Sequence, residues 1–327
     1  MHRLASSSKK SFSPWVLASI AVSAALLTSA CGGQSLSGVG AEPTLSNSAF
    51  TAVPAPSEDL AKDVIDAVKP DAELTSMLPA TMVSEGLRMT TSEGYPPMEM
   101  FATDGETLVG VDPSLGRAIA NKLGLAISIK NEDFNAQIPG ITTGRYDIIM
   151  SSMTDNEERR KTVSFVDYVQ SGSGWVVKKG NPASMGAPET ACGKTVSVVD
   201  NGSSLSLLED FDKECKSSGK ASINILKFAG DQEAILQVRN GRADAAVNDY
   251  PVAAYRAQTS ESILDAVIID GPTSPWGIAI SQKDPKVIQA VQKALQSLIE
   301  EGSYEKILQA WNVEKMAVPS AIVNDGK

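Results

Sequence analysis

Hydrophobic and polar positions alternate between the period of a strand and the period of a helix from Gly86 to Met150. Short apolar runs are separated by segments in which apolar residues recur every three or four positions. The strands that this pattern predicts are 87–91, 108–111, 126–130 and 147–150, and the helices are 113–123 and 134–144. Such alternation favours an α/β fold with a mostly parallel sheet flanked by helices.

The pattern restarts near residue 175 and predicts a second α/β unit of about a hundred residues, the usual size of a domain. Its expected strands are 175–178, 195–199, 222–228, 243–247 and 266–269, and its expected helices are 204–213 and 232–239. An apolar run at 276–280 and two amphipathic helices at 285–300 and 303–311 follow. Because ligands of such sheets bind beyond the carboxyl ends of strands, the polar residues after Met150 are the first candidates for a site.

The first thirty residues have the organisation of a secretory signal peptide. Three basic residues precede the apolar run 15–27, which is too short for an ordinary transmembrane helix and ends in small residues before Cys31. This end is similar to the lipobox of bacterial lipoproteins, in which the cysteine receives diacylglycerol and becomes the mature N-terminus. The alternative is a plain signal peptide with an incidental cysteine.

A flexible tether is expected to follow the cysteine. Residues 31–57 are rich in Gly, Ser, Ala, Pro and Thr and show no periodicity. The next segment, 58–80, begins with apolar residues at helical spacing over 59–69 and is interrupted by Pro70. This helix is too short for an independent coiled coil, so we expect it to pack on the edge of the body.

Composition and charge exclude several classes of function. Three of the 29 Lys and Arg residues and none of the 39 Asp and Glu residues lie in the signal peptide, so the mature chain carries a net charge of −13. An acidic chain argues against nucleic acid as a partner. The sole histidine, His2, lies in the signal peptide. The mature protein therefore has no Ser-His or Cys-His catalysis and no histidine-bound metal.

One of the three cysteines belongs to the lipobox-like end, and the other two lie in the predicted second α/β unit. With Cys31 assigned to lipid, Cys192 and Cys215 remain as a pair in an oxidising compartment, which predicts a disulfide. Two free buried thiols are the alternative. Two cysteines alone supply too few ligands for a metal site.

The polar stretch 151–168 has the chemistry of a carboxylate-binding loop. It contains small hydroxyl side chains and exposed amides directly after a strand, and Arg159 lies five residues beyond Thr154. A guanidinium holds a carboxylate bidentately, and amides at a helix start add partial positive charge.

This stretch resembles the signature region of the polar amino-acid binding proteins, family 3 of the solute-binding proteins that feed ABC importers. The resemblance extends over 85–313 and rests on several motifs in the same order. The further motifs are Tyr95-Pro96-Pro97-Met98-Glu99-Met100, Gly110-Val111-Asp112, Ile138-Pro139-Gly140-Ile141, Gly144-Arg145-Tyr146-Asp147, Gly241-Arg242-Ala243-Asp244-Ala245 and Gly302-Ser303-Tyr304-Glu305-Lys306-Ile307. It implies a two-lobed periplasmic-binding-protein-like fold of type II with a hinge of two crossovers.

The resemblance also implies a carboxylate end for the site. Arg159 matches the arginine that clamps the α-carboxylate of the ligand, and Thr154 and Ser152 match its companions. The alternative for Arg159 is a surface ion pair with Glu157 or Asp167.

At the other end of the ligand, Asp249 matches the aspartate that accepts the α-ammonium, which offers three donors and a charge. Its alternative role is the N-cap of a helix at 251–258. Ser203 and Ser204 resemble a turn that gives one more contact from the second lobe, and the extra residue before this turn leaves open which serine makes it.

Two aromatic residues, Tyr95 and Phe134, match positions that sandwich the ligand side chain. Aromatic faces hold aliphatic stems and cations well. Both residues are also ordinary core candidates. Glu93 lies close enough to Tyr95 to meet a basic side chain, but such a residue is more often solvated.

The predicted organisation follows from these features. The parts are a signal peptide at 1–30, a lipidated tether at 31–57, a helical segment at 58–80, lobe 1 at 82–170 and 275–315, lobe 2 at 171–274 and a C-terminal tail at 316–327. The resemblance implies an extracellular substrate-binding subunit, anchored by lipid to the cytoplasmic membrane, that closes around an amino acid and delivers it to a membrane permease. It implies no cofactor, no metal and no catalysis.

Two alternatives share this scaffold. One is an exported enzyme similar to cyclohexadienyl dehydratase, in which a Glu or Asp would serve as the general acid. The other is a ligand-sensing subunit for a partner receptor.

Overall fold

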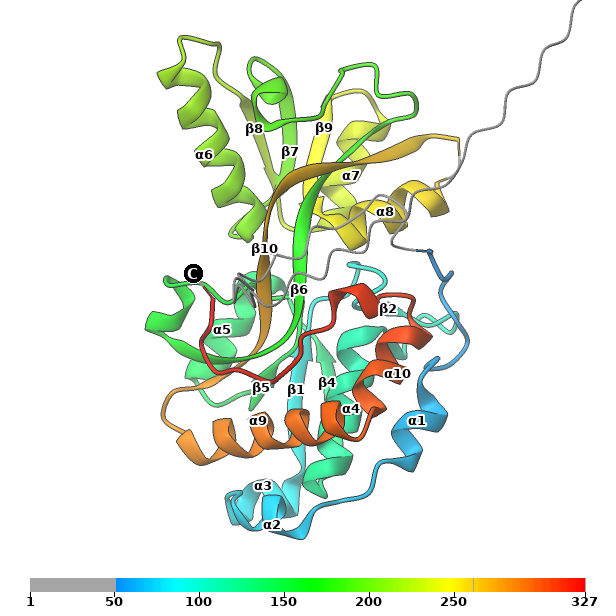
Figure 1. Cartoon of the computed structure of the whole chain (residues 1–327), viewed down its shortest axis with the longest axis vertical. Coiled ribbons are helices and arrows are strands. Elements are labelled where there is room, and N and C mark those ends of the chain that lie inside the picture. Colours follow the sequence, from blue (N-terminus) through cyan, green and yellow to red (C-terminus); the bar gives the residue numbers. More distant parts are fainter. Residues whose placement is uncertain (1–50, 261, 327) are drawn as a thin grey trace, which may run out of the picture. The chain divides into compact units, whose positions relative to one another are not determined.

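The computed structural model describes residues 51–260 and 262–326, so the predicted signal peptide, Cys31 and most of the predicted tether lie outside the described residues. The main sheet has eight strands in a mixed arrangement (Figure 1). Their spatial order is β4 (Ile127–Asn131), β1 (Leu87–Thr91), β5 (Ile148–Ile149), β10 (Leu264–Ser281), β6 (Val163–Lys178), β9 (Ala245–Asp249), β7 (Thr195–Val199) and β8 (Asn224–Phe228).

One end of the sheet, the β1 half, contains β1 with β4 and β5 paired to it in parallel. A two-stranded sheet of β2 (Met100–Phe101) and β3 (Leu108–Val109) belongs to the same half. Its helices are α1 (Lys62–Ala67), α2 (Ala72–Ser76), α3 (Ala80–Glu85), α4 (Val111–Leu123), α5 (Phe134–Thr142), α9 (Pro285–Glu300) and α10 (Ser303–Ala310), with 3-10 turns η1 (Arg159–Lys161) and η3 (Glu314–Met316).

The opposite end, the β7 half, contains β7 with β8 and β9 paired to it in parallel. Its helices are α6 (Ser203–Ser217), α7 (Asp231–Arg239) and α8 (Tyr250–Thr259), with a 3-10 turn η2 (Pro188–Ala191).

Two long antiparallel strands join the halves. β6 has 16 residues and β10 has 18, and they pair with each other from Val163 to Lys178. β10 also pairs with β5, and β6 pairs with β9. The sequence predicted only parts of these strands, at 175–178, 266–269 and 276–280. The Gly- and Ser-rich stretch 170–174 hid the continuity of β6, which is supplied by pairing with residues far away in the chain.

Each half has its own hydrophobic core. In the β1 half, Ile119 of α4 packs in one cluster with Val291 of α9 and Trp311 after α10, all fully buried. The last two helices therefore complete the β1 half although they follow the β7 half in the sequence. A separate cluster in the β7 half contains Val196 of β7 and Leu208 of α6.

The segment 58–80 packs on the edge of the β1 half. Ile65 and Val68 join its core, and the carboxylate of Asp59 forms an ion pair with Arg117 of α4 at 2.9 Å. The expected helix over 59–69 is shorter, Lys62–Ala67, because Asp59 accepts a hydrogen bond from the Ala61 amide and stays outside the helix.

The structure brings Cys192 and Cys215 together, with Cα atoms 5.5 Å apart, a separation typical of disulfides. The helix α6 extends to Ser217 rather than to residue 213. Cys215 therefore lies within the last turn of this helix.

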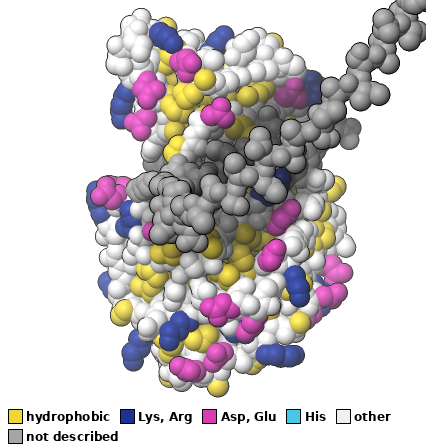
Figure 2. Space-filling view, in the orientation of Figure 1, with side chains coloured by type: hydrophobic (Ala, Val, Ile, Leu, Met, Phe, Trp, Pro, Cys, Tyr) yellow, Lys and Arg dark blue, Asp and Glu magenta, His cyan; other side chains and the backbone are white. Residues whose placement is uncertain are grey.

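The acidic surplus is not gathered into one patch on the face that Figure 2 shows, where Asp and Glu side chains are interspersed with Lys and Arg. None of the helices in residues 51–260 and 262–326 combines the length and apolar character that a membrane span requires.

Candidate ligand-binding site

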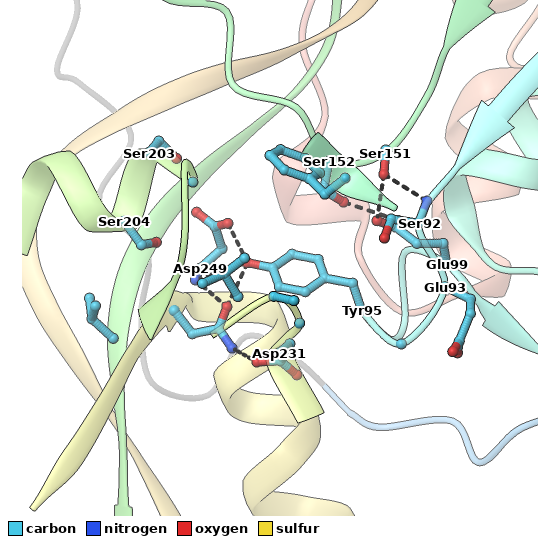
Figure 3. Close-up of a pocket in the computed structure, with 18 of the residues that line it drawn as sticks. Ser92, Glu93, Tyr95, Glu99, Ser151, Ser152, Ser203, Ser204, Asp231 and Asp249 are labelled. Atoms are coloured by element: carbon cyan, nitrogen blue, oxygen red, sulfur yellow. Dashed lines mark hydrogen bonds between the residues drawn. The ribbon is translucent and has the colours of Figure 1, made fainter. Parts of the chain in front are cut away.

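A cavity lies where the carboxyl ends of parallel strands from both halves meet, the place expected for a ligand in such sheets. Most residues that line it lie at or just after the ends of β1, β5, β7, β8 and β9. By loop, they are 92–95, 151–152, 199 with 202–204, 229–231 and 247–249, joined by Glu99, Phe134 and Arg159. In Figure 3, Asp249, Ser203 and Ser204 lie on one side, and Ser151, Ser152 and Glu99 lie on the other.

Arg159 begins the turn η1 just before β6 and reaches the cavity. Its guanidinium donates hydrogen bonds to the carbonyl oxygens of Thr154 at 2.9 Å and Asn201 at 3.0 Å. The Cζ atom lies 5.4 Å from the centre of the Phe134 ring, within the range of a cation–π contact. Burial lowers the pKa of Arg159 to about 10, which the charge of Asp249 opposes.

The ion pairs near Arg159 are formed by its two neighbours and involve neither Glu157 nor Asp167, the partners considered for Arg159. Arg160 pairs with Asp155 at 3.4 Å, and Lys161 pairs with Glu158. Among the described residues, no ion pair joins Arg159 to a carboxylate. Its charge is therefore available to a ligand.

The hydroxyl of Thr154 donates to the Oγ atom of Ser203 at 2.8 Å and so connects the two halves. Ser203 is the first residue of α6, which places the positive end of that helix dipole at the cavity. Ser204 also lines the cavity. Thr154 itself is not among the residues that line the cavity.

Asp249 ends β9 and faces the same cavity from the β7 half. The hydroxyl of Tyr95 lies 2.5 Å from its Oδ2 atom and 2.5 Å from the Oδ1 atom of Asn248, and it accepts a hydrogen bond from the Asp249 amide at 3.4 Å. Figure 3 shows the Tyr95 ring spanning from the β1 half to Asp249. Burial raises the pKa of Asp249 to about 6, while Tyr95 and Arg159 oppose the shift.

Asp249 also directly precedes α8, but its side chain makes no capping hydrogen bond to that helix. The alternative role as an N-cap is therefore limited to the backbone.

Ser152 lines the cavity, but its donors are directed to buried acids. Its amide donates to Asp112 at 2.7 Å and its hydroxyl to Glu99 at 3.2 Å. The residue adopts a left-handed φ of 49°, which these two hydrogen bonds support. Tyr168 of β6 donates a third hydrogen bond, to Asp112 at 2.7 Å.

Glu99 and Asp112 are fully buried beside each other, and the groups that contact them are hydroxyls and an amide rather than cations. Burial is the largest cause that raises both pKa values, that of Asp112 to about 6 and that of Glu99 well above its usual range. The repulsion from Asp112 adds to the shift of Glu99. Both shifts favour one proton held between the two carboxyls near neutral pH.

Sequence reasoning missed Glu99, Asp231 and Asn248 as cavity residues. Asp231 forms an ion pair with Arg256 at 2.7 Å and accepts a hydrogen bond from Asn248 at 2.5 Å. Asp231 and Asn248 follow or end strands β8 and β9, so the rule that pointed to Ser151 also points to them. Within the described residues, no group of three or more Asp, Glu, Cys or His residues is placed to hold a metal ion.

Comparison with known sequences decides the family. The profile of the bacterial extracellular solute-binding proteins, family 3, matches residues 87–314. The chain belongs to this family. The arginine-binding protein ArgT of Corynebacterium glutamicum is 32% identical over 260 residues, which cover 78% of this chain and 84% of ArgT.

Solved structures of similar proteins agree with this assignment. An ancestral arginine-binding protein bound to arginine is 34% identical, with a TM-score of 0.63 over 69% of this chain and 97% of that chain. The ancestral amino acid-binding protein AncCDT-1, a precursor of cyclohexadienyl dehydratase, is 30% identical, with a TM-score of 0.64 over 73% and 99%. The predicted family, the type II fold and the function of a substrate-binding subunit are confirmed.

We expect Glu99→Gln to make the stability of this solute-binding protein less dependent on pH. A carboxyl whose pKa is raised by folding stabilises the protein below its unfolded pKa, near 4.5 for Glu99, and that stability is lost as pH rises through the folded pKa. The wild type should lose stability between pH 5 and pH 8, and the variant should lose less, because it has no carboxyl to ionise at this position.

Urea unfolding at the two pH values measures this difference. Glu106→Gln is the matched control, because Glu106 is exposed. An equal pH dependence in the wild type and Glu99→Gln would contradict a shared proton.

Proposed function

We propose that this protein captures an amino acid with a cationic side chain, arginine above all, for import. The observation that carries the proposal is the pair of opposite charges on one cavity, Arg159 from the β1 half and Asp249 from the β7 half. A guanidinium complements an α-carboxylate, and a carboxylate complements an α-ammonium. The presence of both charges on a single cavity suits a zwitterion.

Carboxylate recognition falls to one end of the cavity. Arg159 and the N-terminus of α6 supply positive charge, and Ser204 supplies a hydroxyl. Thr154 positions this end, because its carbonyl holds Arg159 and its hydroxyl holds Ser203. Ser152 acts in the same indirect way through the acids beneath it.

The ligand side chain lies between Tyr95 and Phe134 in this proposal. The acidic residues that line the cavity favour a side chain with positive charge. Four carboxyls line the cavity, against Arg159 as its lining cation. Three of the four are engaged: Glu99 by the proton it shares, Asp231 by Arg256, and Asp249 by Tyr95. Glu93 is the fourth, and no described residue forms an ion pair or side-chain hydrogen bond with its carboxylate.

The named ligands of relatives support a cation as well. ArgT is named as an arginine-binding protein, and the ancestral protein of 34% identity was solved with arginine bound. The Glu93 carboxylate is only half-buried, so it can attract a guanidinium without the full cost of removing two charges from water.

Closure follows from the two crossing strands. We take 82–170 with 275–315 as lobe 1 and 171–274 as lobe 2, with β6 and β10 as the hinge. Hydrogen bonds already cross between the lobes at Thr154–Ser203 and Tyr95–Asp249. A ligand that adds contacts to both lobes would shift the equilibrium toward the closed form, and that form would dock on a membrane permease.

The anchor and the disulfide belong to the same proposal. The lipobox-like end at Cys31 would hold the protein on the outer face of the cytoplasmic membrane, and Cys192 and Cys215 would be oxidised there. Mass spectrometry of the protein purified from membranes tests both. We expect a mature chain that begins with diacylglyceryl-Cys31 and lacks two hydrogens at the cysteine pair. An unmodified Cys31 or two free thiols would contradict the respective assignment.

An enzyme on the same scaffold is the second candidate, and one observation favours it. Glu99 lies on the wall of the cavity, and burial raises its pKa well above the usual range, as a general acid requires. AncCDT-1, the precursor of a dehydratase, shares the scaffold. The hydrogen bonds that join Glu99 to Ser152 and Asp112 favour a structural role for this residue. Binding without turnover is therefore the preferred function.

We predict that affinity for L-arginine falls below about pH 6. The ligand ammonium binds the ionised form of Asp249, whose pKa burial raises to about 6, so each pH unit below that value should weaken binding about tenfold. Isothermal titration between pH 4.5 and pH 8 measures the dependence.

Asp249→Asn is the control for this titration. It should weaken binding about a hundredfold at pH 7.5, because an ammonium loses its counter-charge, and it should flatten the profile. A profile of equal slope in the variant would show that another group titrates.

Glu93→Gln tests the assignment of the side-chain end. We expect affinity for arginine to fall roughly three- to tenfold while any affinity for glutamine is unchanged, because only the guanidinium loses a partner. Glu106→Gln, which removes an exposed charge away from the cavity, is the matched control. Equal losses for both ligands would place the Glu93 carboxylate elsewhere.

A further inference from the structure

The C-terminal segment 317–326 covers an edge of β6. One edge of this strand pairs with β10 along its length, whereas β9 occupies the other edge only at 173–177. On the free part of that edge, the amide of Asp167 donates to the carbonyl of Ile322 at 2.9 Å. Phe165 and Asn324 exchange two further hydrogen bonds, of 2.8 and 3.1 Å. The segment thus satisfies backbone groups that an edge strand leaves unpaired.

The end of this segment contacts the loop that carries the proposed carboxylate clamp. The amide of Gly326 donates to Asp155 at 2.8 Å, and the guanidinium of Arg160 donates to the carbonyl oxygens of Asn324, at 3.1 Å, and Gly326. The Asp155 carboxylate is fully buried. A Cβ atom at Gly326 would lie 2.0 Å from the Asp155 carbonyl oxygen, so the two backbones are in close contact.

These contacts lie directly beside residues of the site. Asp155 follows Thr154, and Arg160 follows Arg159, so each contact residue is covalently joined to a proposed ligand residue or its support. On its other side the loop is held by β10, because the Asp155 amide donates to Pro275 at 3.0 Å. The loop 154–160 is therefore packed between β10 and the C-terminal segment.

The segment lies beyond residues 87–314, which the family profile matches. Its polar contacts are built from buried or charged groups. The amide of Asp325 donates to Asp167, a buried carboxylate on β6, at 3.2 Å. Hydrogen bonds to charged groups are stronger than those between neutral groups, so these contacts hold the segment against β6 and the loop.

We propose that the C-terminal segment 317–326 is a positioning element of the ligand site, acting through Asp155 and Arg160 on the loop that presents Arg159. It orders this loop before the ligand arrives, which lowers the entropic cost of binding. The inference rests on the proposed function for its effect on affinity, but its effect on the loop is independent of any ligand.

The test compares the wild type with a chain that ends at Val323, which loses the contacts to Asp155 and Arg160. Hydrogen–deuterium exchange of residues 155–162 without ligand should be faster by about tenfold, since hydrogen exchange reports local opening. Affinity for L-arginine, measured by isothermal titration, should fall by about tenfold. Ile322→Ser, which changes an exposed side chain of the same segment, is the control and should behave as the wild type.

A second variant covers the case in which the shortened chain does not fold. Gly326→Ala adds one carbon atom where the space is closed by Asp155 and should displace only the end of the segment. If the variants that fold show unchanged exchange in 155–162, the proposal is overturned. It is also overturned if the wild type binds arginine and these variants bind it with the same affinity. If the wild type binds no amino acid, the proposed function fails, and the exchange measurement still decides this inference.

Discussion

The ladder between β6 and β10 is the constraint on which the rest of the structure depends. In the main sheet the strands of the β1 half reach those of the β7 half only through this pair. Arg159 lies four residues before β6 begins, and Asp249 is paired with Ser173 of the same strand. Both charges of the proposed site are thus positioned relative to one strand. A ladder of this length can bend between the halves while the residues within each half keep their places.

Charge imbalance is the second constraint. Buried acids outnumber buried cations around the cavity, and their charge is offset in three different ways: raised pKa values of Glu99 and Asp112, an ion pair between Asp231 and Arg256, and a tyrosine hydroxyl on Asp249. In the proposed function, Arg159 at one end and the excess of negative charge elsewhere would select a zwitterion with an additional positive charge.

Much of the fold could be predicted from the sequence, because local patterns specify it. The bounds of β1, β7 and α9 agree with the apolar periodicity to the residue. The continuity of β6 and β10 could not be predicted in this way, since Gly and Ser in 170–174 carry no strand pattern and only the partner strands hold them extended. The return of α9 to the core of the β1 half likewise depends on contacts with α4, which are distant in the sequence.

The site was predictable to a similar degree. Arg159 and Asp249, which the resemblance assigned to the ligand site, both line the cavity. The environment of Glu99 depends on Asp112, which the sequence shows only as part of a motif. The direction of the Ser152 donors, toward acids rather than into the cavity, follows from its left-handed backbone and had no sequence signal. The C-terminal segment read as a simple tail, because its partners on β6 and at Asp155 are more than 140 residues earlier in the chain.

A crystal structure of the mature protein with L-arginine tests the central claim most directly. The account predicts one ligand in the cavity, with its carboxylate on the Arg159 guanidinium, its ammonium on Asp249 and its guanidinium between Tyr95 and Phe134 toward Glu93. Arginine bound in the reverse orientation, or an empty cavity at saturating arginine, would contradict it.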